Sequence, residues 1–237
     1  MKQRNKEHKM QNIKLSELVK NHPEATIFLN EHHIDYCCRG DHFLYESLEE
    51  QGYEIEPFLE ELEAFTTEQK EKHSAVIADD VYMMGVHDLI THLEATHHKD
   101  ERALLSSIDG NLLALLSAHY ARHKDELREV YTLFSTLRSE LMLHFAQEEV
   151  EVFPLMQREA TKKAYEKVVS LESDHEAAGD LIKRLIKATH DFTAPVDGCA
   201  TYRATYALLK QLVEDIFLHI YKENSILFPM YAEGVNA

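Results

Sequence analysis

The stretch HFAQEEVEVFPLM (residues 144–156) returns as HIYKENSILFPM (residues 219–230), 75 residues further along the chain (219 − 144). Histidine, glutamate, phenylalanine and proline keep the same spacing in both copies. An α-helix advances about 3.6 residues per turn, so a histidine and a glutamate four residues apart project from one face. Each copy therefore offers one imidazole and one carboxylate to a common point.

A further histidine precedes each copy at a similar distance. His175, in ESDHEAAG (residues 172–179), lies 44 residues before His219 (219 − 175), and His98 lies 46 residues before His144 (144 − 98). A loop easily absorbs a difference of two residues. The duplication predicts six metal ligands: His98, His144, Glu148, His175, His219 and Glu223.

His97 is the alternative to His98, because adjacent helical residues point about 100° apart. A stripe through Ile90 and Leu104 favours His97, whereas a stripe through Leu105 favours His98. The duplication arithmetic favours His98, and the choice between the two histidines stays open at this point.

The donor set of four imidazoles and two carboxylates suits iron, manganese or zinc, and it contains no thiolate. Two cations inside one bundle need bridging anions, and one glutamate from each half can supply them. Six side chains around two cations leave positions open for a small ligand. The predicted centre lies in the core of a helical bundle, where such sites are built.

The residues around these motifs predict four long amphipathic helices, at 84–108, 111–157, 161–190 and 199–231, the second interrupted near His119–Lys124. Apolar side chains recur at helical spacing, for example from Leu127 to Leu141. Residues 107–110 and 191–198 are the expected connections. Short loops between long helices predict an all-α fold with an antiparallel four-helix bundle over residues 81–237.

Residues 1–65 precede the bundle as a small helical domain, followed by a charged linker at 66–80. We expect short helices from Ser16 to His22, and at 23–32, 44–51 and 56–65. Cys37 and Cys38 lie in a turn that Gly40 closes. Such a turn tends to expose its residues, and Arg39 would favour the reactive thiolate. Two partly buried structural thiols are the alternative interpretation.

The composition excludes several classes of function. The net charge of −17 argues against nucleic acid and against an anionic membrane as partners. No apolar run approaches the roughly 20 residues that a membrane span needs, and the first residues lack the apolar core of a signal peptide. Three cysteines, two of them adjacent, do not form a secreted disulfide framework. A reducing cytoplasm is the expected location.

The chain resembles the repair-of-iron-centres family. IDYCCRG (residues 34–40) is similar to the short ScdA-type N-terminal domain of that family, and the bundle motifs around His144, His175 and His219 resemble hemerythrin-like domains. Together the two motifs cover about residues 13 to 232. Gly179 stands where oxygen-carrying hemerythrins have a further histidine, and Arg39 stands where the repair family commonly has glycine.

The resemblance implies a hemerythrin-like bundle with two non-haem iron ions. The four histidines would be terminal ligands, and Glu148 and Glu223 would bridge the irons together with an oxo or hydroxo group. It also implies repair of iron–sulfur clusters damaged by nitric oxide or peroxide. Iron donation to damaged or apo iron–sulfur proteins is the expected mechanism, with Cys37 and Cys38 in iron transfer or redox chemistry.

Two other functions stay open. The same centre would serve a di-iron enzyme that reacts with nitric oxide or dioxygen, or a sensor that binds these gases without releasing iron. The chain carries no recognisable catalytic motif, so whether it is an enzyme is not decided by the sequence. Nor are the client proteins, the native redox state and the existence of a homodimer.

Overall fold

The computed structural model describes residues 11–71, 79–158 and 161–236. The chain separates into two compact units, Met1–Met83 and Met84–Ala237. Within the described residues the fold is all-α, as predicted, and the only β-type pairing there is an isolated antiparallel bridge between Lys14 and Phe43. No helix in this part of the chain is long and apolar enough to cross a membrane.

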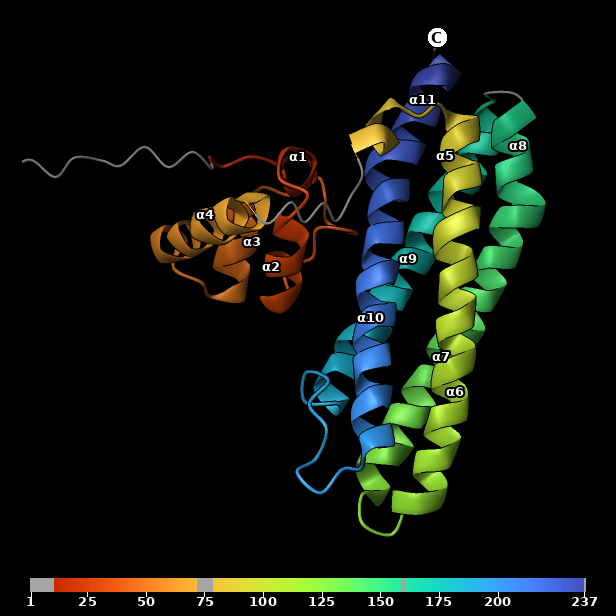
Figure 1. The fold of residues 1–237 in the computed structure, drawn as a ribbon. Coiled ribbons are helices and arrows are strands. Elements are labelled where there is room, and N and C mark those ends of the chain that lie inside the picture. The colour runs from red at the N-terminus through yellow and green to blue at the C-terminus, as the bar shows by residue number, and fades with distance from the viewer. Residues whose placement is uncertain (1–10, 72–78, 159–160, 237) are drawn as a thin grey trace, which may run out of the picture. The chain divides into compact units, whose positions relative to one another are not determined.

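The N-terminal unit consists of four short helices (Figure 1): α1 (Leu15–Asn21), α2 (Ala25–Glu31), α3 (Leu44–Gln51) and α4 (Ile55–Glu71). Its core contains an aromatic cluster in which the Phe28 ring stacks on His32 at 4.0 Å and meets the edge of Phe58 at 5.2 Å. Leucines from α1, α2 and α3 complete this small core.

The predicted linker at 66–80 is partly helical. Helix α4 continues to Glu71 because Thr66 is buried and Glu, Gln and Lys are good helix formers. Residues 72–78 lie outside the described residues, and a short 3₁₀ helix, η1 (Asp79–Met83), follows them.

The C-terminal unit is a bundle of four long helical rods (Figure 1). They are formed by α5 (Val86–Leu93) with α6 (Lys99–His119), by α7 (Lys124–Gln147) with α8 (Phe153–Arg158), by α9 (Lys162–Ala188), and by α10 (Ala200–Lys222) with α11 (Phe228–Asn236). Helix α6 packs against both α7 and α10, and α7 packs against α9. The connections at 120–123 and 189–199 turn the chain back, so consecutive rods are antiparallel.

The predicted connection at residues 107–110 was wrong, because these residues lie inside α6 and the chain turns instead at 120–123. Leu105, Ile108 and Leu112 are buried at helical spacing, so the apolar stripe passes through Gly110 without a break. A glycine within a helix is tolerated when packing on both sides supports the helix.

Three rods contain a π-helical segment, in which one residue more than usual fills a turn: η2 (Glu94–His98), η3 (Glu148–Val152) and η4 (Glu223–Leu227). The last two begin at the repeated glutamates. Because the backbone N–H of Glu148 still donates to His144 and that of Glu223 to His219, each His–Glu pair keeps its helical spacing. Such bulges cluster at functional sites because they change the direction of side chains.

Replacing Gly110 by alanine is expected to raise the free energy of unfolding by about 1 kcal/mol, because glycine is that much poorer than alanine inside a helix. Gly110 is exposed, and an added Cβ would meet nothing within 4 Å. Urea unfolding followed by circular dichroism measures the change.

The matched control is Gly198→Ala, whose added Cβ would lie 2.8 Å from the carbonyl oxygen of Pro195. This variant should be less stable than the wild type. A destabilised Gly110→Ala protein would show that residues 107–110 are not the regular helix described.

Candidate metal centre

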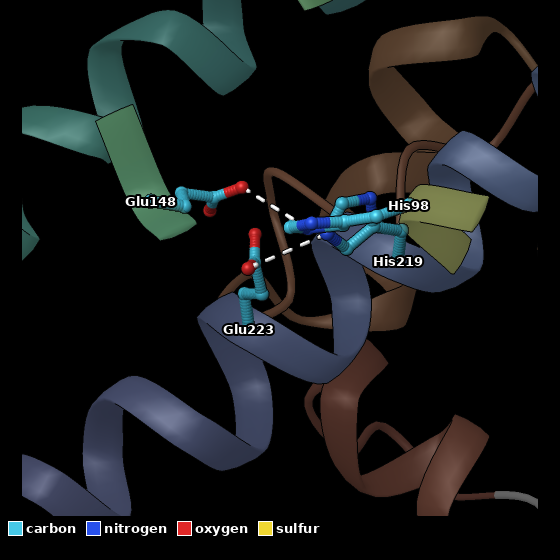
Figure 2. Close-up of side chains that lie close together, drawn as sticks. All are labelled: His98, Glu148, His219 and Glu223. Atoms are coloured by element: carbon cyan, nitrogen blue, oxygen red, sulfur yellow. Dashed lines mark ion pairs between the residues drawn. The ribbon is translucent and has the colours of Figure 1, made fainter. Parts of the chain in front are cut away.

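The structure brings all six predicted residues together inside the bundle. They are buried, and every rod contributes: η2 carries His98, α7 and η3 carry His144 and Glu148, α9 carries His175, and α10 and η4 carry His219 and Glu223. Figure 2 shows four of them converging from three rods. Two overlapping groups result, in which the potential ligand atoms lie within 4.8 Å of one another. One contains His98 and His219, the other contains His144 and His175, and both contain the two glutamates.

Each glutamate points one oxygen at each histidine pair. Glu148 places Oε2 3.3 Å from His98 Nε2 and Oε1 3.2 Å from His144 Nε2. Glu223 places Oε1 3.4 Å from His219 Nε2 and Oε2 3.1 Å from His175 Nε2. Two carboxylates that each span two imidazole pairs have the arrangement of bridging ligands.

The polar atoms at this point fit bound cations. His98 Nε2, His219 Nε2 and all four oxygens of the two glutamates are buried and make no hydrogen bond among the described residues. Burying such atoms without partners costs several kcal/mol in total, at roughly 1–3 kcal/mol each. Cations held between imidazole nitrogens and carboxylate oxygens would satisfy every one of these atoms.

The close packing of buried carboxylates and imidazoles also shifts the pKa values of the metal-free centre. Burial and the neighbouring charge of Glu223 raise the pKa of Glu148 to about 8. Burial works to lower the pKa of His219, but the charges of Glu223 and Glu101 outweigh it and hold that pKa well above its usual value. Protons therefore occupy the centre when no cation does, and cation binding must displace them.

The repeated phenylalanines pack against the histidines. Phe153 stacks on His98 with ring centroids 5.9 Å apart, and Phe228 stacks on His175 at 6.1 Å. Phe145 also stacks on His98, with ring centroids 4.7 Å apart. The conserved spacing between the two copies thus sets the imidazole orientation as well as supplying the donor atoms.

A second layer of side chains contacts the outer Nδ1 atoms of the histidines. His98 Nδ1 donates to Glu149 Oε1 at 2.7 Å, and His219 Nδ1 donates to Glu101 Oε1 at 3.1 Å. His175 Nδ1 donates to Asn224 Oδ1 at 2.9 Å. These partners were not among the predicted residues, although the repeat offered a signal: Glu149 and Asn224 each directly follow the glutamate of their copy.

His97 lies outside both groups. Its Nδ1 donates to Asp215 at 3.0 Å, and its Nε2 lies 2.7 Å from Lys222 Nζ, which also lies 3.0 Å from His92 Nε2. Both His97 and His98 are buried, but only His98 faces the two glutamates. His97 instead belongs to a polar network behind His219, on whose ring it stacks at 5.3 Å.

A cavity of about 320 Å³ adjoins the centre. Three of the four histidines line it, namely His144, His175 and His219, together with Ala178 and Glu140. It gives a small molecule room beside the donor atoms.

Cys37 and Cys38 lie 3.8 Å apart at sulfur, and Cys37 Sγ lies 3.4 Å from Asp35 Oδ1. The expected exposure of the pair was wrong for Cys37, which is buried, while Cys38 is half-buried. Burial and the neighbouring Cys38 raise the pKa of Cys37 well above its usual value. The Arg39 guanidinium pairs with Glu50, so its charge is shared with that carboxylate.

Cys199 is the thiol with the lowered pKa. It is exposed at the start of α10, where a backbone N–H and His119, whose Nε2 lies 3.3 Å from the sulfur, lower its pKa to about 7. The sequence signal was its position at a helix N-terminus, which stabilises a thiolate.

Comparison with known proteins gives matches in both units. The model of the hemerythrin HHE cation-binding domain matches residues 89–231, and the ScdA N-terminal domain, a domain of unknown function, matches residues 11–66. The chain is 27% identical over 220 residues to the iron–sulfur cluster repair protein YtfE of Enterobacter sp. (strain 638), covering 93% of this chain and 96% of that protein. The YtfE protein of Yersinia pseudotuberculosis is 27% identical over 216 residues, or 90% and 93% of the two chains.

Proposed function

This chain belongs to the hemerythrin HHE cation-binding family, which implies iron binding, and we propose that its bundle holds a di-iron centre for the repair of damaged iron–sulfur clusters. The observation that carries the proposal is the pair of buried glutamates, each with one oxygen toward each histidine pair. His98 and His219 would bind one iron and His144 and His175 the other. Glu148 and Glu223 would bridge them, with an oxo or hydroxo group between.

When bound, the two irons would be available for transfer and would have coordination positions open to small ligands. The protein holds the donors in place through stacked phenylalanines and the outer hydrogen bonds of the histidines. Glu148 can hold a proton at neutral pH once the centre is empty, because its pKa is about 8. Loss of iron is thereby coupled to uptake of a proton at a carboxylate oxygen.

The curated relatives named as iron–sulfur cluster repair proteins cover nearly the whole chain, including both units. We therefore propose damaged or apo iron–sulfur proteins as the recipients of the iron. The reducing cytoplasm is the proposed setting, since the three cysteines, all of them described, form no disulfide.

We assign iron transfer to the N-terminal unit. Asp35, Cys37 and Cys38 bring a carboxylate oxygen and two sulfurs within 4.8 Å of one another, a donor set that can receive a cation once the thiols lose their protons. The raised pKa of Cys37 means that a cation binding there must displace the thiol proton.

Replacing both Cys37 and Cys38, as Cys37→Ala with Cys38→Ser, is expected to leave two irons per chain but to slow cluster restoration at least about tenfold, because the receiving sulfurs are gone. The measurement is the return of absorbance and activity in an apo iron–sulfur protein incubated with the iron-loaded full chain. The matched control is Cys199→Ser, which removes an exposed thiol whose pKa is lowered to about 7 and should restore clusters at the wild-type rate. Equal restoration by the double variant would exclude these cysteines from the transfer.

A reaction with nitric oxide or dioxygen is the second candidate function, favoured by the cavity beside His144 and His175. Either gas is small enough to enter it. Turnover of nitric oxide to nitrous oxide with a chemical reductant would identify an enzyme, whereas gas binding with iron retained against a mild chelator would identify a sensor.

A further inference from the structure

The two halves of the centre are related by the sequence repeat, so their outer contacts can be compared position by position. The residue that follows the bridging glutamate is Glu149 in the first copy and Asn224 in the second. The residue three positions after the first-rod histidine is Glu101, and its counterpart after His175 is Ala178. At both positions a carboxylate supports one half and a neutral side chain stands in the other.

The half with His98 and His219 is supported by two carboxylates. Glu149 accepts from His98 at 2.7 Å, and Glu101, which is fully buried, accepts from His219 at 3.1 Å. A carboxylate behind an imidazole makes its other nitrogen a stronger donor and fixes the ring orientation. Asp215 adds a third carboxylate near Glu101. The charge of Glu149 is shared with Arg102, whose guanidinium donates to it at 2.8 Å.

The half with His144 and His175 has weaker support, from one neutral amide and one longer contact to a half-exposed carboxylate. Asn224 offers His175 a neutral amide oxygen. His144 Nδ1 is buried and makes no hydrogen bond among the described residues, and its nearest acidic contact is Asp174 Oδ2, 3.6 Å away on a side chain that is 47% exposed. Ala178 cannot accept from His144 as Glu101 accepts from His219.

Ala178, at the position that Glu101 occupies in the other half, also borders a possible exit path for a cation. Ala178 lines the cavity of about 320 Å³, and both His144 and His175 line it too. His98 does not reach this cavity, and its ring is covered by Phe145 and Phe153. His219 lines the cavity as well, so the His144–His175 position borders this space with both of its histidines and the His98–His219 position with only one.

We propose that the two cation positions are unequal, and that the His144–His175 position releases its cation first, through the cavity beside Ala178. This inference rests on the proposed di-iron centre and assigns the transferable iron to one half of it. Release is a ligand exchange without oxidation or reduction. From the reduced centre, the bonds from His144, His175 and one oxygen of each glutamate would break, together with any bond from the bridging hydroxo group, which would stay on the remaining cation. The cation would leave as Fe²⁺, and the recipient would supply the new donors.

The experiment follows release of Fe²⁺ from the full chain to the chromogenic chelator ferrozine, under anaerobic stopped-flow conditions. The expected time course has two phases of equal amplitude, whose rates differ at least about tenfold, the lower end of what outer hydrogen-bonding partners contribute to metal affinity. Crystals grown after removal of one equivalent should show anomalous scattering only at the His98–His219 position.

Matched variants assign each phase. Glu101→Gln should speed the slow phase about tenfold and leave the fast phase unchanged, because only His219 loses its carboxylate. Ala178→Glu, which copies Glu101 into the second half, should slow the fast phase alone. If Ala178→Glu fails to fold, Asn224→Glu tests the same half without filling the cavity. This variant copies Glu149 and should also slow the fast phase alone.

A single release phase, an accelerated fast phase in Glu101→Gln, or residual iron at His144 and His175 would overturn the inference while leaving the di-iron centre intact. A wild-type chain that binds no iron would instead refute the proposed function.

Discussion

Replacing Glu148 by glutamine is expected to remove both cations from the centre, although only one residue changes. Each oxygen of Glu148 faces a different histidine pair, at 3.3 Å from His98 and 3.2 Å from His144. Glutamine is nearly isosteric, but it carries no charge and turns one of these oxygens into an N–H donor that cannot ligate a cation. Each cation position then loses either a ligand atom or the negative charge that balances the cation. The loss of affinity should exceed the 10–100-fold that is typical when a hydrogen-bonding partner of a ligand is removed.

The measurement is iron per chain after anaerobic gel filtration, and Glu223→Gln should behave in the same way. The matched control is Glu140→Gln, one helical turn before His144, which changes the same charge on the cavity wall but belongs to neither group of donors. That variant should retain the iron. A Glu148→Gln chain that keeps a full pair of irons would rule out the bridging role.

Removing the metal is expected to make the protein lose stability as the pH rises from 6.5 to 8. The pKa of Glu148 is about 8 in the folded metal-free chain, above its usual value near 4.5. In this window the folded state holds a proton that the unfolded state has lost, so the free energy of unfolding falls with pH. One proton over 1.5 pH units corresponds to about 2 kcal/mol.

Other titratable groups also change the free energy of unfolding, either between pH 6.5 and 8 or below it. The raised pKa values of His219 and of Glu101, the latter about 7, have the same sign and add to the loss. Burial lowers the pKa of His97 to about 4, so this residue weakens the fold only as the pH falls below 6.5. Cys199, whose pKa is lowered to about 7, also titrates above 6.5, but with the opposite sign. The comparison with Glu148→Gln, which leaves Cys199 unchanged, therefore isolates the contribution of Glu148.

Urea unfolding of the metal-free chain at pH 6.5 and 8.0 tests this expectation. Glu148→Gln should flatten the pH dependence, since its amide cannot ionise, and the iron-loaded wild type should show a smaller slope because bound cations stabilise the ionised carboxylates. A metal-free wild type that is equally stable at both pH values would mean that Glu148 titrates as an ordinary surface acid.

The six residues of the centre could be selected from the sequence because a duplicated motif repeats both the chemistry and the helical spacing. His98 shows how much depended on the repeat: His97 is almost equally buried, so an apolar stripe could not separate them. Only the distance to the next motif pointed to the residue that faces Glu148 in the structure.

The outer contacts could not be predicted, because they depend on which residues of different rods meet. Glu101 and His219 are 118 positions apart, and no local pattern brings them together. The π-helical segments were missed because their sequence reads as continuous helix, and no residue in them distinguishes a wider turn from a regular one. Gly110 misled the helix assignment for the opposite reason, since packing of Ile108 and Leu112 overrides its weak local preference.

Metal analysis combined with Mössbauer spectroscopy, on full-length protein purified without oxygen, tests the account most directly. Two irons per chain that give the spectrum of a magnetically coupled pair are the predicted result. A chain with intact His144 and His219 that holds no transition metal in either redox state, or that holds only isolated single ions, would contradict it.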